Sequence, residues 1–351
     1  MERLRRGIPI MVWLCRQRSE REPPFEEKER NSGETSTPGE TMARTVMQTT
    51  MDDVTLEQGT VGGTDRPVDQ RAIARACILW HPNKPESQIL AQQMADALQA
   101  AHREAWIGSA WDEKAVTAEL GDADLLITLG GDGTILRAAR MGARFGVPIL
   151  GVKMGRLGFL AEVQPDNWRV PLSRLLAGEY WLEERMMLDV KVKHHASNQA
   201  HDHHFEALND VVVSRGSLAR IVRVAASLDG SYLTTYAADG VIVATATGST
   251  GYALAAGGPI LPPELNNILL VPIAPHLSLE RALVLSQGVT VRLEVFFDHQ
   301  AIVTVDGQFE VDLDQGDIVL VTSSQNLARF VRMRASNYFW QTLMDRLRWH
   351  L

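Results

Sequence analysis

The sequence predicts an α/β domain with a parallel sheet, followed by a β-rich domain of antiparallel strands. Between residues 76 and 177, short apolar runs alternate with stretches whose apolar residues recur at helical spacing, as in a parallel sheet with crossover helices. From Met187 onward, several runs alternate apolar and polar residues, which is typical of antiparallel strands with one buried face. A length of 351 residues accommodates both domains and a sizeable core.

The bulk composition argues against several classes of protein. The net charge is −8, from 35 basic and 43 acidic residues, so a nucleic-acid partner held by attraction to phosphate is not expected. The two cysteines, Cys15 and Cys77, make neither a disulfide framework nor a zinc site, which favours a reducing, cytoplasmic setting. No apolar stretch is long enough to span a membrane, so no membrane partner is expected.

Residues 1–72 have the composition of a disordered or non-native extension, rich in Arg, Glu, Ser, Thr, Gly and Pro and without an apolar period. An apolar patch near the start faintly resembles a signal peptide, but it contains Pro9 and lacks a small-residue cleavage site. Met42, Met47 and Met51 are alternative in-frame starts.

The α/β domain is predicted at residues 73–182. Its strands are short apolar runs and its helices carry one apolar face. The expected strands are 76–80, 125–129 and 149–152, and the expected helices lie around 86–103, 113–120, 135–141 and 165–177.

The turn between the strand at 125–129 and the following helix carries the strongest chemical signal of this domain. Gly130, Gly131 and Gly133 let backbone amides approach a ligand closely, and a helix N-terminus favours phosphate. Asp132 would repel a bound phosphate, but it suits a site where a proton or a hydroxyl group is handled. The alternative is an aspartate that merely caps the helix.

The β-rich domain is predicted at residues 183–323. Residues 324–351 follow as a C-terminal segment whose amphipathic helix is expected to pack back on the α/β domain. Five of the ten histidines cluster between two strand-like runs, which indicates a solvated hairpin loop, with a metal-binding tract as the alternative. They are His194, His195, His201, His203 and His204.

Two polar segments interrupt the β-rich domain. Residues 239–259 are rich in Gly, Ala, Ser and Thr, are not explained by strand alternation, and open into a helix-like stretch. Amides and hydroxyls of this kind bind sugar hydroxyls and phosphates. Asn209 and Asp210 place an amide and a carboxylate at the start of a strand, where they could bind a base edge or ribose hydroxyls.

These blocks together resemble the bacterial NAD kinases. The resemblance covers residues 75 to 351, whereas diacylglycerol, sphingosine and 6-phosphofructo kinases share only the Gly-Gly-Asp-Gly turn. Its blocks are Gly130–Thr134, Gly155–Leu160, Glu184-Arg185, Asn209-Asp210, 239–259, Pro275-His276 with Arg281, and Asp306-Gly307-Gln308.

The resemblance implies an NAD kinase/diacylglycerol kinase-like fold and a kinase of NADP biosynthesis. Such enzymes transfer a phosphoryl group from ATP, or from polyphosphate in some members, to the 2′-hydroxyl of the adenosine ribose of NAD. They require a divalent metal, here expected to be Mg²⁺ that enters with the donor and is not held by protein side chains alone. They are usually homo-oligomers, so a dimer or tetramer is expected.

The resemblance also implies roles for individual residues. Asp132 matches the proposed proton acceptor. The implied phosphate contacts are Gly130, Gly131, Lys153 and Arg156. The implied NAD contacts are Asp132, Gly133, Asn209, Asp210, Arg220, Asp239, Thr250, Gly251, Tyr252, Ala253, Leu254, Ala255, Ala274 and Gln308.

One departure from the family pattern lies at the phosphate-facing turn, where Lys153 replaces the usual Asn. A cation there could strengthen the grip on phosphate or change the preferred donor. Two other classes stay open: a lipid or sugar kinase that shares only the glycine turn, and a non-catalytic NAD-binding or NADP-sensing protein in which Lys153 has disrupted donor binding.

Overall fold

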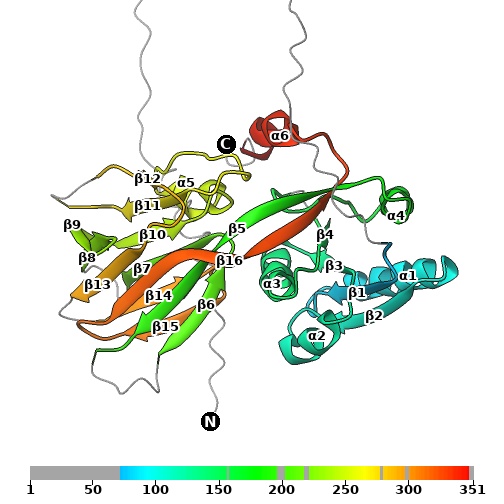
Figure 1. The fold of residues 1–351 in the computed structure, drawn as a ribbon, viewed down its shortest axis with the longest axis horizontal. Coiled ribbons are helices and arrows are strands. Elements are labelled where there is room, and N and C mark those ends of the chain that lie inside the picture. Colours follow the sequence, from blue (N-terminus) through cyan, green and yellow to red (C-terminus); the bar gives the residue numbers. More distant parts are fainter. Residues whose placement is uncertain are drawn as a thin grey trace, which may run out of the picture. The chain divides into compact units, whose positions relative to one another are not determined.

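The computed structural model describes residues 72–155, 158–195, 202–216, 221–276, 280–296 and 300–347 (Figure 1). The predicted extension therefore lies outside the described residues, apart from residue 72, as do Arg156 and Arg220 of the predicted site. Within the described part of the chain, no helix is both long and apolar enough to cross a membrane.

The first part of the described chain is the predicted α/β domain with a parallel sheet. Its sheet order is β2-β1-β3-β4, and all three neighbouring pairs are parallel. The strands are β1 (Arg75–Trp80), β2 (Glu104–Ser109), β3 (Leu125–Gly130) and β4 (Ile149–Lys153). The helices are α1 (Pro85–Ala100), α2 (Glu113–Leu120), α3 (Asp132–Ala143) and α4 (Arg169–Leu176).

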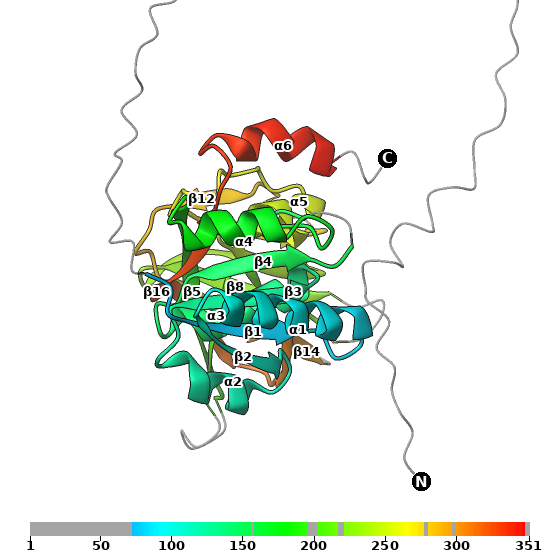
Figure 2. The ribbon, with the colours of Figure 1, turned by 90° about the vertical axis from the view of Figure 1, so that its right-hand side faces the viewer.

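Helices cover both faces of this sheet, as expected for crossover connections. Apolar residues of α1 and α4 pack on one face with Ile78 and Ile127, and Figure 2 shows these two helices on the same side of the strands. Residues of α2 and α3 pack on the other face with Cys77 and Leu126. All residues of β3 are buried, which explains its continuous apolar run.

Strand β2 is the element of this domain that the sequence pattern missed. It pairs only with β1, and its residues are partly or fully exposed, so it shows neither a continuous apolar run nor a period of two. The sequence analysis therefore placed no element between the helices expected around 86–103 and 113–120. Pairing with β1 decides its conformation, since the register from Arg75↔Glu104 to Trp80↔Ser109 is unbroken.

The second part consists of antiparallel strands in two sheets. One sheet has the order β12-β11-β10-β7-β14-β15, and the other continues from β4 through β16-β13-β8-β9, with β5 joining β16 to β6. The strands are β5 (Trp181–Lys193), β6 (His203–Ala207), β7 (Asp210–Arg215), β8 (Val222–Leu228), β9 (Ser231–Ala238), β10 (Gly240–Ala244), β11 (Ile268–Ile273), β12 (Leu283–Leu285), β13 (Val291–Phe296), β14 (Ala301–Val305), β15 (Phe309–Leu313) and β16 (Ile318–Arg332).

The inner faces of the two sheets form one apolar core. Val190 and Val321 from one sheet lie in the same cluster as Val213 and Val303 from the other. The short helices η3 (Gly248–Thr250) and α5 (Tyr252–Ala255) follow β10, and Ala253 packs with Ile242 on the outer face of the second sheet.

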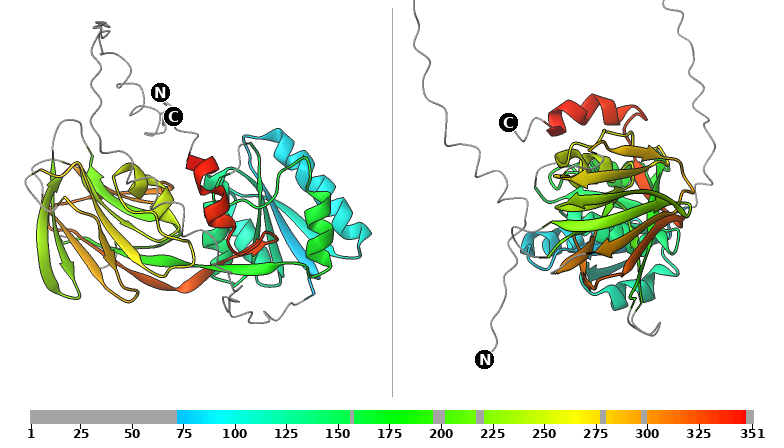
Figure 3. Two further views of the ribbon diagram at one scale, coloured as in Figure 1. Left: turned by 90° about the horizontal axis from the view of Figure 1, so that it is seen from above. Right: turned by 90° about the vertical axis from the view of Figure 1, so that its left-hand side faces the viewer.

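Strands β5 and β16 run through both parts of the structure (Figure 3). They pair along most of their length, from Ile318↔Lys193 to Arg332↔Trp181, with an irregularity between Ser323 and Leu327. The predicted boundaries at 182/183 and 323/324 fall inside these strands, so the chain crosses them without leaving the sheet. A parallel bridge between Phe330 and Ile149 joins the two sheet regions.

Helix α6 (Tyr338–Leu347) follows β16. The Phe339 ring lies 6.2 Å from that of Phe159, and the Tyr338 hydroxyl donates a hydrogen bond of 2.9 Å to Oε1 of Glu183. These contacts attach the start of α6 to the loop after β4 and to β5. The domain boundaries themselves stay a prediction.

Candidate functional site

The glycine turn lies at the carboxyl end of β3, where Gly131 is the N-cap of α3 in an extended conformation. A side chain at Gly130 would collide with Thr134, because its Cβ would lie 2.3 Å from Oγ1 of Thr134. A Cβ at Gly131 or Gly133 would meet no atom within 4 Å, so space is open beside both residues. The first amides of a helix lack intrahelical acceptors and favour anions. The turn can therefore receive a phosphoryl group.

Asp132 begins α3, and its carboxylate contacts a lysine from the neighbouring strand. Nζ of Lys153 lies 2.6 Å from Oδ1 of Asp132. The two strands bring these residues together, because β3 and β4 pair in the register Gly130↔Lys153. A Cβ at Gly158 would lie 2.3 Å from Oδ2 of Asp132, so any larger residue there would displace this carboxylate.

A buried aspartate organises the segment that contains Asn209 and Asp210. The carboxylate of Asp306 accepts backbone hydrogen bonds from Leu208, Asn209 and Asp210, at 2.9, 2.8 and 3.1 Å. Asp306 itself has a φ of 50°, a left-handed conformation that aspartate tolerates in turns. Its carboxylate thus fixes the backbone from which the predicted Asn209 and Asp210 side chains project.

Burial perturbs the two neighbouring carboxyl groups. Burial raises the pKa of Asp210 to about 7, and the charge of Asp306 adds to this effect. Burial also raises the pKa of Asp306, although the three amide donors and the charge of Arg140 oppose the shift. A carboxyl group whose pKa lies near neutrality can donate or accept a proton under physiological conditions.

A hydrogen bond joins the β-rich part to the glycine turn. Nε2 of Gln308, in the tight turn between β14 and β15, donates to the backbone oxygen of Gly133 at 2.9 Å. One residue further on, the guanidinium of Arg140 in α3 lies 4.5 Å from the centre of the Phe309 ring. The Asp306–Gln308 turn therefore touches both the Asn209-Asp210 segment and the turn that carries Asp132.

The segment at 245–252 packs closely on the Asn209 backbone. A Cβ at Gly248 would lie 2.1 Å from the backbone oxygen of Asn209, and Oγ1 of Thr245 donates a hydrogen bond to the oxygen of Leu208. The Cβ position of Gly251 lies 4.0 Å from Nδ2 of Asn209 and 3.9 Å from Oδ2 of Asp210. The predicted NAD contacts on β7 and in the 250–255 block are therefore neighbours.

The start of the 239–259 block corrects the sequence interpretation. Residues Gly240–Ala244 form strand β10, which is buried along its whole length between β7 and β11. A central strand covered on both faces shows no alternation, so the pattern of small and apolar residues concealed it. The turn and helix predicted after it are present as η3 and α5.

Asp239, just before β10, pairs with an arginine that the sequence interpretation missed. Nη2 of Arg215 lies 3.2 Å from Oδ2 of Asp239, and the Arg215 amide donates to the Asp239 backbone oxygen at 3.1 Å. Burial, followed by the charges of Asp239 and Asp210, raises the pKa of Tyr252. Arg215 is the last residue of β7, the strand that begins with Asp210. Its place in the same strand as a predicted NAD contact is the signal in the sequence that could have drawn attention to it.

The predicted contact Ala274 directly follows β11 and has a φ of 44°.

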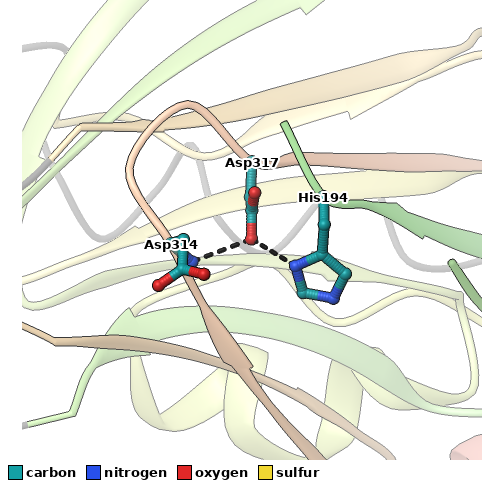
Figure 4. A group of neighbouring side chains, drawn as sticks. All are labelled: His194, Asp314 and Asp317. Carbon is teal, nitrogen blue, oxygen red and sulfur yellow. Dashed lines mark hydrogen bonds and ion pairs between the residues drawn. The ribbon is translucent and has the colours of Figure 1, made fainter. Parts of the chain in front are cut away.

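One residue of the histidine cluster, His194, lies with Asp314 and Asp317 in a group of potential metal ligands (Figure 4). Oδ2 of the buried Asp317 lies 2.6 Å from Nδ1 of His194 and accepts a hydrogen bond from the Asp314 amide at 2.8 Å, and its Oδ1 accepts one from the His195 amide. These bonds hold the end of β5 against the β15–β16 turn with protein groups alone. The solvated-loop and metal-tract alternatives concern a segment that lies partly outside the described residues.

The raised pKa of Asp210 predicts a pH dependence of stability. The unfolded chain releases this proton near pH 4, whereas the folded protein keeps it until about pH 7, so the free energy of unfolding should fall as pH rises from 4 to 7. Asp210→Asn removes this titration. Relative to the unmodified protein, it should gain on the order of 2 kcal/mol between pH 5 and pH 8.

Urea unfolding at pH 5 and pH 8 measures this difference. Asp312→Asn is the matched control, because Asp312 lies on an exposed site of β15. Equal shifts in the free energy of unfolding at both pH values for Asp210→Asn would contradict the prediction.

Family models and relatives of known activity both match most of this chain. Residues 70–180 match the family model described as the ATP-NAD kinase N-terminal domain, and residues 208–333 match the ATP-NAD kinase C-terminal domain. The chain is 39% identical to an NAD kinase of Dehalococcoides mccartyi (strain CBDB1) over 271 residues, which cover 77% of this chain and 95% of that protein. It is 42% identical to an NAD kinase of Chloroflexus aurantiacus over 276 residues, which cover 79% of this chain and 99% of that protein.

Solved structures are also similar. A yeast NADH kinase complexed with NADH superposes with a TM-score of 0.67 at 27% sequence identity, covering 79% of this chain and 88% of that chain. An NAD kinase from Archaeoglobus fulgidus in complex with ATP gives a TM-score of 0.63 at 29% identity, covering 78% of this chain and 98% of that chain.

Proposed function

Because this chain belongs to the NAD kinase family, a family of enzymes, we propose that it phosphorylates the 2′-hydroxyl of the adenosine ribose of NAD to give NADP. The main support in the structure is the accessible Asp132 carboxylate, which stands at a helix N-terminus beside open glycine backbone. The hydrogen bond from Gln308 to Gly133 ties this turn to the β-rich part that carries Asn209 and Asp210.

Asp132 serves as the proton acceptor in the proposed reaction. The ribose oxygen forms a bond to the terminal phosphorus of the donor as its proton passes to the Asp132 carboxylate. The bond from that phosphorus to the bridging oxygen breaks, and ADP leaves when the donor is ATP. General-base assistance of this kind is worth about 10²–10⁴-fold in rate, and positioning and charge neutralisation supply the larger part.

The dinucleotide is proposed to contact the surface formed by the Asn209-Asp210 segment and the 250–255 block. The close packing of Gly248 on Asn209 and of Gly251 beside Asp210 supports a shared binding surface. The amide and carboxyl groups there match the donors and acceptors of an adenine edge and ribose hydroxyls. The proposed NAD contacts also include Asp239, Ala274 and Gln308. Arg220 is proposed as an NAD contact from the family resemblance alone.

The donor phosphates are proposed to bind at the glycine turn. Open space beside Gly131 and Gly133 supports close approach of phosphate oxygens to the backbone. A divalent cation, proposed to be Mg²⁺, prefers phosphate and carboxylate oxygens and would neutralise charge on the transferring group. The open space beside Gly131 and Gly133 fits a cation that enters with the donor, whose phosphates would supply most of its ligands, and Asp132 is left to act as the proton acceptor.

The finer properties of the enzyme are proposals as well. We expect ATP or inorganic polyphosphate as donor, a homo-oligomeric dimer or tetramer, and a cytoplasmic location. The test of the function is an assay of the full chain with NAD or NADH and each donor in the presence of Mg²⁺, with NADP or NADPH as the readout.

The two other classes of protein predict different results in this assay. A non-catalytic NAD-binding protein would bind NAD in calorimetry and form no NADP with either donor. A lipid or sugar kinase would phosphorylate diacylglycerol or fructose 6-phosphate and leave NAD unchanged. The matches to both domains of the NAD kinase family favour NADP formation.

A further inference from the structure

Lys153 is placed to act on Asp132 before any substrate binds. Its ammonium lies 2.6 Å from Oδ1 of Asp132, and its side chain is only 12% exposed. Backbone bonds hold Lys153 at the end of β4: its amide donates to the Val163 oxygen at 3.0 Å, and the next amide, of Met154, donates to the Gly130 oxygen at 2.9 Å. The lysine therefore sits at a rigid point of the parallel sheet, directly beside the glycine turn.

The two oxygens of the Asp132 carboxylate are in different environments. Within the described residues Oδ1 is buried and accepts no hydrogen bond, and the Lys153 ammonium is its ion-pair partner, whereas the side chain as a whole is 44% exposed. The accessible side of the carboxylate is therefore that of Oδ2. An ion pair with a well-ordered partner restricts the rotation of a carboxylate on a short side chain.

Gly158 also restricts the position of the Asp132 carboxylate. A Cβ at this position would lie 2.3 Å from Oδ2 and 2.4 Å from Oδ1, so the backbone of the loop after β4 packs directly on the carboxylate group. Asp132 is thus held between the Lys153 ammonium at the end of β4 and Gly158 in the following loop, with Oδ1 beside the ammonium.

We propose that Lys153 is a positioning residue that binds Oδ1 of Asp132, so that Oδ2 is presented to the 2′-hydroxyl of the acceptor ribose. This inference rests on the proposed role of Asp132. It assigns the lysine to the orientation of the proton acceptor, whereas the sequence suggested a contact with phosphate. Because misplacement of a reacting group by about 1 Å can cost about 100-fold in rate, loss of the ion pair should mainly affect kcat.

The test compares Lys153→Met, Lys153→Gln and Lys153→Arg in the NAD kinase assay. Lys153→Met should lower kcat about 10- to 100-fold, with the KM values for NAD and ATP within about 3-fold of the unmodified enzyme. Lys153→Arg keeps the charge and should recover part of the lost kcat. Lys191→Met is the matched control, because it removes another lysine paired with an aspartate, Asp189 at 3.2 Å on β5, and should leave kcat unchanged.

A double-mutant cycle separates positioning from independent action. If Lys153 acts through Asp132, Lys153→Met should cause less than about a 2-fold further loss in an Asp132→Asn background. An added loss as large as in the unmodified enzyme would overturn the proposal, as would a raised KM for ATP with unchanged kcat, which indicates phosphate binding. Thermal melting identifies misfolded variants, and the Gln and Arg variants then carry the test.

Failure of the proposed function would look different from failure of this inference. If the unmodified chain forms no NADP with either donor, the function itself is wrong. If it forms NADP and Lys153→Met retains full kcat, only the positioning role is wrong.

Discussion

Replacing Asp132 with asparagine is expected to lower kcat for NADP formation by about 10²–10⁴-fold while NAD binding stays nearly intact. Asparagine has almost the same shape and retains an oxygen acceptor, but it cannot take up the proton of the ribose hydroxyl. The change in kcat is measured in steady-state assays, and the dissociation constant of NAD by calorimetry.

The structure adds a complication that the experiment must control. Asp132 is the ion-pair partner of Lys153, whose side chain is only 12% exposed, so the amide substitution also leaves a cation without its counter-charge. A small loss of thermal stability is therefore expected, and binding of NAD must be measured below the melting temperature.

Asp112→Asn is the matched control for this substitution. Asp112 is the N-cap of α2, where its Oδ1 accepts a hydrogen bond from the Ala115 amide at 3.1 Å. Asparagine caps helices about as well as aspartate, so kcat should change by less than about 2-fold. If Asp132→Asn retained the kcat of the unmodified enzyme, Asp132 would not be the proton acceptor.

The largest effect on stability is expected at Glu183. This side chain lies in a buried network, where Oε2 is 2.9 Å from Nη2 of Arg185 and 2.8 Å from Nη2 of Arg332. Arg185 is 2% exposed and Arg332 is fully buried. Tyr338 donates to Oε1 at 2.9 Å, and Arg332 also donates to the Leu160 oxygen. Removing Glu183 would leave the buried Arg185 guanidinium without its counter-charge and would leave Arg332 with only its longer pair to Glu162, at 3.6 Å.

Glu183→Ala should therefore lower the free energy of unfolding by about 3–5 kcal/mol, the usual cost of removing one partner of a buried ion pair. The adjacent Glu184 provides the control, because its pair with Arg329 at 3.0 Å is solvent-exposed and should contribute less than about 1 kcal/mol. Urea unfolding of Glu183→Ala and Glu184→Ala measures both. Similar losses for the two variants would show that the buried network is not a main source of stability.

The same carboxylate predicts part of the acid sensitivity of the protein. Burial raises the pKa of Glu183, but Arg185 and Arg332, with the hydrogen bond from Tyr338, outweigh it and lower the pKa to about 2. The stabilisation is therefore fully present above the unfolded pKa of about 4.3 and is lost as pH falls toward 2. Between pH 5 and pH 2, the free energy of unfolding of the unmodified protein should therefore fall more steeply than that of Glu183→Ala. Acid unfolding curves of both proteins measure this difference.

The sequence predicted the fold class correctly because the strongest patterns are local. The apolar run at 125–129 and the helical spacing after it reappear as β3 and α3, and the alternation around 188–193 and 301–305 as parts of β5 and β14. Where tertiary pairing decides the conformation, the patterns failed. Strand β2 is an edge strand that is partly buried on both faces, and β10 is central and fully buried, so neither shows a period of two.

For the candidate site, local sequence motifs were enough to identify which residue types could act. The chemical properties and the family resemblance of the site can be read from three short contiguous segments, which are Asp132 with its neighbouring glycines, Asn209-Asp210 and residues 239–259. The fold class and the kinase family are confirmed by the structure and the comparisons, whereas the roles of the individual site residues stay predictions.

Which charges meet depends on how the strands pair in the folded protein. Lys153 pairs with Asp132 because β3 and β4 lie parallel with Gly130 opposite Lys153, and Asp306 binds three amides almost one hundred residues earlier because β7 and β14 pair. Arg215 meets Asp239 for the same kind of reason, through the pairing of β7 with β10. Ion pairs and pKa values depend on distance and burial, and a linear sequence specifies neither until the register of its strands is known.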